Sequence, residues 1–283
     1  MLKQPILNQL NLHFINYCNY DCVYCFADKT VAGYPDINSL VKWVDSISDY
    51  FKKNQVINPR INLVGGEPLL YKEILPLIKY IHSKGIRVSL VTNGSLLTEE
   101  FLSEAGEFLD MIGISVDTLK KETAIMIGRS TQNEQTLSLK KLITICKKIK
   151  SLNIRLKVNI VVSKFNFMED FSIFLDRIEA DKVKFLELYI VNQMNRDSFE
   201  YKLSKEEYNK FCSRHSMCKN ILKEDNEKFD GGYIMIDFKG DLIVNHKNKH
   251  IHCGNIELED FSILAKKALK TVKIENYRLR EVS

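Results

Sequence analysis

The chain has 283 residues, 45% of them hydrophobic, which is enough for one large α/β domain or for one domain with a C-terminal extension. Its 41 basic and 36 acidic residues leave a formal net charge of +5, so the composition is not that of a nucleic-acid-binding protein. The sequence has no signal-peptide pattern and no apolar run of about 18 residues, so we expect a cytoplasmic protein with no membrane partner.

The first two thirds of the chain alternate between strand-like and helix-like patterns. Strand patterns cover residues 9–15, 60–64, 87–92, 110–116, 155–162 and 182–191. Helical stripes of apolar residues cover 38–53, 71–84, 98–105 and 168–178, and a helix-rich stretch spans 119–152. Strands that alternate with helices in this way predict a parallel sheet with right-handed crossovers. The loops that follow the strands should then meet at one rim of the sheet.

The pattern changes after residue 192. The predicted elements are a helix over 204–215, a β-hairpin over 232–237 and 241–244, a polar loop over 246–252, a last helix over 260–269 and a charged tail. We expect this part of the chain to cover the mouth that the strand ends form.

The chain contains seven cysteines, and three of them, Cys18, Cys22 and Cys25, lie within one short stretch. In a cytosolic protein such a cluster indicates metal ligands rather than disulfides. Structural zinc sites and iron–sulfur cubes usually take four protein ligands, so three cysteines leave one position to fill. In a zinc site His13 or a remote cysteine could fill it. Alternatively, the open position binds a ligand that takes part in the chemistry.

The stretch CNYDCVYC, followed by a strand that ends in Gly65-Gly66-Glu67-Pro68, resembles the cluster loop and glycine motif of the radical S-adenosylmethionine (SAM) superfamily. The resemblance implies that the three cysteines bind a [4Fe–4S] cluster whose fourth iron is chelated by SAM. It also implies the fold class, an α/β fold with a partial (β/α)6 barrel in residues 1–192. Residues 193–283 would be a C-terminal α+β extension that closes the substrate site.

Within that superfamily the chain is similar to the viperin family, and we identify it with the prokaryotic viperin homologues. The shared motifs follow one another in the same order: Asn11-x-His13-Phe14, CNYxCxxCF, INxxGGEP, NGSL, Ser115-x-Asp117, Ile127-Gly128-Arg129, Lys157-x-Asn159 and Tyr233-Ile-Met-Ile-Asp237. The chain departs from animal members at both ends, because it begins almost at the first strand and its only tryptophan is Trp43. We therefore do not expect their membrane-binding helix or their terminal tryptophan here.

The resemblance implies a 3′-deoxy-3′,4′-didehydro-nucleotide synthase. In this family a 5′-deoxyadenosyl radical takes the ribose 4′ hydrogen of a ribonucleoside triphosphate (CTP, GTP or UTP), and the 3′ hydroxyl then leaves as water. The implied product is an antiviral nucleotide that terminates nucleic-acid chains. The implied protein partner is an electron donor such as flavodoxin or ferredoxin. No motif in the sequence indicates which nucleobase is preferred.

Several residues match the SAM-binding positions of the family. They are Phe26, Gly65, Gly66, Glu67, Asn93 and Ser115. The glycines have no Cβ, so the backbone at these positions can approach a ligand closely. Taken alone, the glycine motif could be a turn after a strand, and the asparagine and serine could be ordinary strand-end caps.

A triphosphate needs several cations, and lysine and arginine side chains suit phosphate oxygens. The residues that match substrate contacts of the family are Asn11, His13, Arg60, Arg129, Lys157, Asn159 and Lys184. Lys157 and Lys184 interrupt apolar strands, whereas a single cation elsewhere is usually a solvated surface charge. Tyr233 matches a tyrosine proposed as a late donor of an electron or a proton. Its alternative role is that of a half-buried aromatic residue in a hairpin.

Two other functions remain open from the sequence. A radical SAM enzyme that modifies a peptide or a cofactor precursor would carry an auxiliary cluster, but Cys212, Cys218 and Cys253 lack the paired short spacing of such a site. A non-enzymatic zinc-binding module would leave the glycine motif unexplained.

Overall fold

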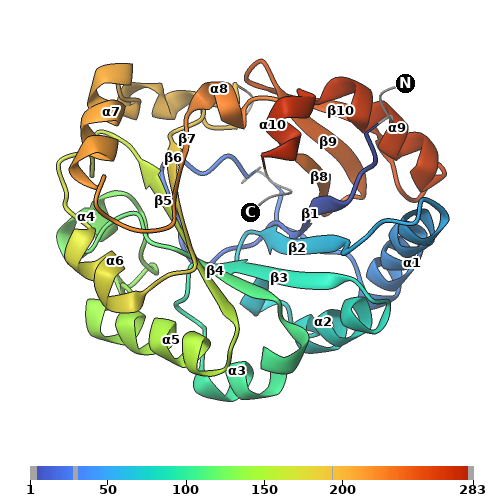
Figure 1. The fold of residues 1–283 in the computed structure, drawn as a ribbon, viewed down its shortest axis with the longest axis horizontal. Helices are drawn as coiled ribbons and strands as arrows, with labels where there is room; N and C mark the ends of the chain where they lie inside the picture. The colour runs from blue at the N-terminus through green and yellow to red at the C-terminus, as the bar shows by residue number, and fades with distance from the viewer. Residues whose placement is uncertain (1–4, 28–30, 193, 280–283) are drawn as a thin grey trace.

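The computed structural model describes residues 5–27, 31–192 and 194–279. In this part of the chain ten strands form one sheet, in the order β10-β9-β8-β1-β2-β3-β4-β5-β6-β7. Most of the helices lie around the outer side of the sheet (Figure 1). No helix among these residues is both long enough and apolar enough to cross a lipid bilayer.

The six predicted strands are present and run parallel, and they lie side by side in chain order. Their bounds are β1 Gln9–Ile15, β2 Arg60–Gly65, β3 Arg87–Thr92, β4 Met111–Ser115, β5 Arg155–Val162 and β6 Lys182–Glu187. The helices between them are α1 Ile37–Lys53, α2 Ile74–Ser83, α3 Glu99–Ala105, α4 Lys121–Met126, α5 Leu139–Ser151 and α6 Ser172–Ile178. This arrangement confirms the predicted partial barrel of strands with outer helices.

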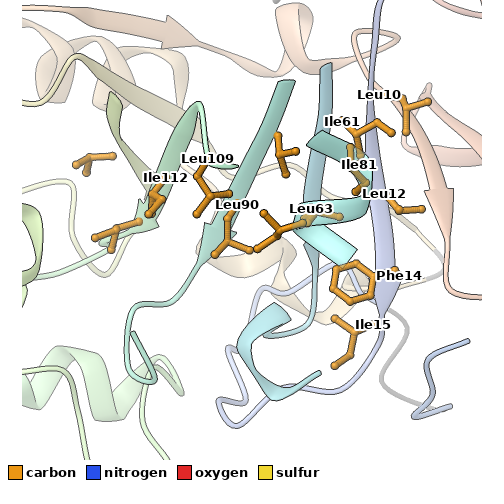
Figure 2. Close-up of a cluster of buried hydrophobic side chains, with 14 of the residues drawn as sticks. Leu10, Leu12, Phe14, Ile15, Ile61, Leu63, Ile81, Leu90, Leu109 and Ile112 are labelled. Atoms are coloured by element: carbon orange, nitrogen blue, oxygen red, sulfur yellow. The ribbon is translucent and has the colours of Figure 1, made fainter. Parts of the chain in front are cut away.

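The core lies between the outer face of the sheet and the helices. Every second side chain of the parallel strands points to this face, as on β5, where Leu156, Val158 and Ile160 are fully buried. Figure 2 shows the same alternation on β1 and β2, whose apolar side chains lie beside Ile81 of α2. Each such side chain contributes about 1.5–3 kcal/mol of burial free energy. The intervening side chains point to the inner face, where polar residues such as Asn62, Lys157 and Lys184 lie among apolar ones.

The second part of the chain extends the same sheet at both edges. Strand β7, Ile221–Glu224, pairs with β6 and was not predicted. The predicted hairpin is confirmed as β8, Ile234–Asp237, and β9, Asp241–His246, and β8 pairs parallel with β1. Helices α7, Lys205–Arg214, and α8, Asn226–Phe229, lie before and after β7 in the chain.

The polar loop predicted over 246–252 is wrong. These residues form a two-residue turn followed by strand β10, Lys249–Asn255, which pairs antiparallel with β9. Lys247 and Asn248 both have positive φ, which matches the right-handed twist of a tight hairpin. The strand is polar because it is the last one in the sheet and its side chains are partly exposed.

The charged tail predicted after the last helix is also wrong within the described residues. Helix α9, Phe261–Thr271, is followed by a short helix α10, Ile274–Arg278. The Tyr277 side chain of α10 is buried, and its hydroxyl accepts hydrogen bonds from the Asn8 and Gln9 amides, both 3.2 Å long. The same hydroxyl donates to the Gln9 carbonyl oxygen at 2.9 Å. The tail segment therefore fixes the beginning of β1, and its last residues, 280–283, lie outside the described part.

We expect Tyr277→Phe to lower the free energy of unfolding by about 1–3 kcal/mol, because it leaves the part-buried amides of Asn8 and Gln9 without their acceptor. Urea unfolding followed by circular dichroism measures this change. The control is Tyr34→Phe, since the Tyr34 side chain is 57% exposed, and it should change the value by less than about 0.5 kcal/mol. Equal effects of the two substitutions would contradict the structural role of α10.

Candidate active site

A cavity of about 330 Å³ lies on the inner side of the sheet. Cys22 and Cys25 border it near the carboxyl ends of the strands. Arg60 and Lys182, the first residues of β2 and β6, border it at the opposite end. The predicted site residues that line it are Asn11, His13, Cys22, Cys25, Phe26, Arg60, Gly65, Ser115, Arg129, Lys157, Asn159, Lys184 and Tyr233. Cys18, Gly66, Glu67 and Asn93 do not border it.

Backbone hydrogen bonds hold the cysteine loop from two sides. The end of β2 forms one side, where the Gly66 amide donates to the Ile15 carbonyl at 2.7 Å and the Glu67 amide donates to the Tyr17 carbonyl at 2.8 Å. The segment after α4 forms the other side, where the Gly128 carbonyl accepts from the Asp21 amide at 3.0 Å. Main-chain contacts thus anchor the loop on both of these sides.

Only glycine fits at these contacts, because a side chain would collide with the main chain of the cysteine loop. A Cβ on Gly66 would lie 2.0 Å from the Tyr17 carbonyl oxygen, and one on Gly65 would lie 2.2 Å from the Ile15 carbonyl oxygen. A Cβ on Gly128 would lie 2.0 Å from the Asp21 carbonyl oxygen. The sequence suggested that Gly65 and Gly66 let the backbone approach a ligand. In the structure the close neighbour is the chain's own cysteine loop, although Gly65 also borders the cavity.

Glu67 and Asn93 lie behind the cysteine loop. The Glu67 carboxylate is fully buried and accepts hydrogen bonds from the Thr92 hydroxyl at 2.7 Å and the Asn93 amide at 2.8 Å. Burial raises the pKa of Glu67, and these bonds partly offset that rise. The Asn93 side-chain amide donates to Asn19 at 2.9 Å and to the Cys18 sulfur at 3.9 Å. Both residues therefore connect the ends of β2 and β3 to the loop.

The cysteine sulfurs have surroundings that suit an iron–sulfur cluster. The Cys18 sulfur accepts from the Tyr20 amide at 3.4 Å, and the Cys25 sulfur accepts from the Ala27 amide at 3.5 Å. Such hydrogen bonds stabilise cluster thiolates. Among the described residues no three His, Cys, Asp or Glu side chains are arranged to hold a single metal ion. A cube differs from a single ion because each thiolate binds a separate iron atom.

Asp117 organises the rim beside the cysteines and was not assigned a role from the sequence. Its buried carboxylate accepts hydrogen bonds from the Tyr24 hydroxyl and from Arg129, both at 2.9 Å, and from the Val161 amide at 2.8 Å. Arg129 also donates to the Ser115 carbonyl at 2.7 Å. Burial raises the pKa of Tyr24 well above its ordinary value, so the phenol remains neutral. Arg129 is therefore held at the cysteine end of the cavity.

The opposite half of the cavity is rich in cations. Lys184 is buried, and its ammonium lies 2.8 Å from Glu224 on β7 and donates to the Tyr233 hydroxyl at 3.0 Å. The Tyr233 hydroxyl donates to Glu224 at 2.6 Å. Arg60 pairs with Asp110 at 2.7 Å. The sequence did not indicate Glu224, because its strand was not predicted.

Lys157 differs from these cations. In the part of the chain that the structure describes, its ammonium has neither a hydrogen-bond partner nor an acidic partner within ion-pair distance. Burial, and secondarily Lys184 and Lys182, lower its pKa well below the ordinary lysine value. An anion that entered the cavity would relieve this unfavourable charge.

Comparisons with known proteins show the family of this chain. The sequence model of the Radical SAM superfamily matches residues 12–178. The chain is 30% identical to the S-adenosylmethionine-dependent nucleotide dehydratase of Flammeovirga pacifica, over 89% of this chain and 87% of that protein. It is also 30% identical to the protein of the same name from Lacinutrix mariniflava, over 94% of this chain, but it spans only 56% of that protein's length.

The fold is also similar to that of a solved structure. For anSMEcpe with bound AdoMet and the Kp18Cys peptide, the TM-score is 0.71 at 16% sequence identity, with 95% of this chain and 83% of that chain covered. At this identity the similarity concerns the fold alone.

We expect Gly66→Ala to displace the cysteine loop, because the new Cβ would meet a main-chain oxygen that cannot move by itself. After anaerobic reconstitution, the iron content per chain should fall well below that of the unaltered protein. Gly106→Ala is the control, since its Cβ would lie 3.3 Å from the flexible end of Ile154. If Gly66→Ala retained full iron content, the steric argument would be wrong.

Proposed function

The chain belongs to the radical SAM superfamily and, within it, to the S-adenosylmethionine-dependent nucleotide dehydratases, and we propose that it removes water from the ribose of a ribonucleoside triphosphate. The observation that carries the substrate class is Lys157. It is a half-buried lysine with no acidic group within ion-pair distance among the described residues, and it borders the same cavity as Cys22 and Cys25. An anionic substrate held there would reach toward the cysteine loop.

Cys18, Cys22 and Cys25 would hold a [4Fe–4S] cluster that leaves one iron for SAM. When bound, the cluster and SAM supply a 5′-deoxyadenosyl radical able to take the ribose 4′ hydrogen. The SAM-binding residues that we propose at the cavity wall are Phe26, Gly65 and Ser115, with Gly66, Glu67 and Asn93 behind them as the support of the loop. The protein's own part is to position the ribose and to exclude water.

The cations would orient the substrate along the cavity. We propose that Lys157, Lys184 and Arg60 contact the triphosphate from the opposite half of the cavity and Arg129 contacts it from the cysteine end. Lys157 would gain the most, because none of the described residues places an acidic group within ion-pair distance of it. Asn11, His13 and Asn159 line the wall between the two ends of the cavity. Within the described residues the Asn159 side-chain oxygen is buried without a hydrogen-bond donor, so it is an acceptor suited to a ribose hydroxyl.

Tyr233 is suited to complete the reaction. Loss of the 4′ hydrogen as an atom, followed by loss of the 3′ hydroxyl as water, consumes one electron and one proton. A phenol O–H bond supplies both, and Tyr233 lies within hydrogen-bond distance of Glu224 and Lys184. A protein electron donor, such as flavodoxin or ferredoxin, would then restore the tyrosine.

The C-terminal part of the chain contributes to this site. Phe229, Tyr233, Met235 and Tyr277 line the cavity, so we infer that residues 193–283 close the substrate site left open by residues 1–192. The product would keep its triphosphate and lack a 3′ hydroxyl, so a polymerase could add it but could not extend beyond it. We infer a role in antiviral defence on this ground.

Anaerobic incubation with SAM, dithionite and each ribonucleoside triphosphate tests the proposal. At least one triphosphate should yield a product lighter by one water, together with 5′-deoxyadenosine, in mass spectra. The corresponding nucleoside and monophosphate should react poorly, since they lack the charges that the lysines bind. The Cys22→Ala variant should form neither product. Equal turnover of a nucleoside and its triphosphate would contradict the phosphate assignment.

We expect Lys157→Met to raise the KM for the triphosphate about 10- to 150-fold, which corresponds to the loss of one charge-assisted contact of about 1.5–3 kcal/mol. The same variant should unfold at an equal or higher temperature, because it removes a half-buried charge that has no ion-pair partner among the described residues. Lys147→Met, on the exposed side of α5, is the control and should change neither quantity. A large loss of thermal stability in Lys157→Met would assign the lysine a structural role instead.

A further inference from the structure

A second cavity, of about 230 Å³, adjoins the main one beside the cysteine loop. The two share a wall formed by His13, Phe26, Ala27, Gly65 and Met235. The remaining wall comes mainly from β8, β9 and β10, the strands that follow the partial barrel. A ligand whose centre lies at the shared wall could thus extend into both cavities.

The shared side of this cavity is aromatic. The Phe26 ring lies 6.5 Å from the His13 ring and 6.4 Å from the His250 ring, measured between centroids. Burial lowers the pKa of His13 to about 4 and also lowers that of His250, so both imidazoles are neutral at pH 7. The Nε2 atom of His250 is buried and has no hydrogen-bond partner in the described residues. Flat rings and one unused polar atom suit a planar heteroaromatic ligand.

The opposite side carries two carboxylates, Asp237 and Asp241. One oxygen of Asp237 accepts the Lys239 and Asp241 amides, both at 2.9 Å, and its other oxygen has no hydrogen-bond donor among the residues described. Lys239 is the only lysine or arginine of the described chain that borders this cavity, and its ammonium lies over the Phe238 ring. The cavity therefore disfavours phosphate and favours a ligand that donates N–H groups.

We propose that this side cavity binds the nucleobase and selects a base that carries an exocyclic amino group. The inference rests on the proposed function, which places the triphosphate at Lys157 in the main cavity. The ribose would then lie at the shared wall, next to Cys25 and Phe26, where the 4′ hydrogen must be taken. A carboxylate accepts hydrogen bonds from the amino group of cytosine or guanine, whereas it repels the carbonyl oxygen that uracil has at the same position as the cytosine amine.

Two substrate pairs that differ at one amino position test the proposal: CTP against UTP, and GTP against ITP. In the pair that is turned over, the unaltered protein should favour the amino base in kcat/KM by at least about tenfold, the effect of one hydrogen bond to a charged group. The Asp237→Asn variant keeps the acceptor oxygen for the hairpin amides but loses the charge. It should reduce the preference to less than about threefold, mainly through KM. Asp49→Asn, on the exposed side of α1, should leave the preference unchanged.

Several results would overturn the inference. Equal turnover of both members of each pair by the unaltered protein would do so while supporting the proposed function. An Asp237→Asn variant that loses affinity for SAM, with an unchanged base preference, would assign the side cavity to the adenine of SAM. A third result separates the two proposals. If CTP bound more tightly than UTP, or GTP more tightly than ITP, without reductant, and neither was dehydrated when reductant was added, the side cavity would be supported and the proposed function contradicted.

Discussion

The site depends on one close contact between two stretches of main chain, the end of β2 and the start of the cysteine loop. A Cβ at Gly66 would lie 2.0 Å from a carbonyl oxygen of that loop, so only glycine permits the two hydrogen bonds that join them. The contact therefore fixes the position of the cysteine loop relative to the sheet. Because β2 is hydrogen-bonded along both edges, to β1 and to β3, the loop is placed by a strand inside the sheet.

The positions of the cysteines and lysines relative to the strands give the site two chemically different ends. The cysteines follow β1, whereas Lys157, Lys182 and Lys184 point inward from β5 and β6. In a parallel sheet the loops after the strands lie at the rim, and every second side chain of a strand points to the inner face. The thiols therefore lie at the rim and the lysines on the inner face, and the sheet fixes the distance between the two groups. A ligand with one anionic end and one reacting end fits this arrangement better than a small symmetric one.

Much of the fold could be predicted because its strands and helices have strong apolar periodicity, as β5 illustrates. The elements that were missed lack that signal: β7 and α10 are four and five residues long, and β10 is polar because it is an edge strand. The site was predictable where a local motif exists. Asp117 and Glu224 could not be assigned from the sequence, because their roles come from Tyr24 and Lys184, which are remote in the chain and near only after folding.

Lys157 lowers the stability of the fold locally, and the proposed triphosphate would offset that loss. Its pKa in the folded chain lies below that of an unfolded chain, so the folded state binds the proton less tightly. This difference lowers stability at low and neutral pH, and the loss is recovered as the pH rises from the folded value to the unfolded value. A phosphate group bound at the lysine would act in the opposite direction on its pKa, because it favours the protonated form. Lys184 is already paired with Glu224 and would gain less from a phosphate than Lys157, which has no such ion pair within the described part of the chain.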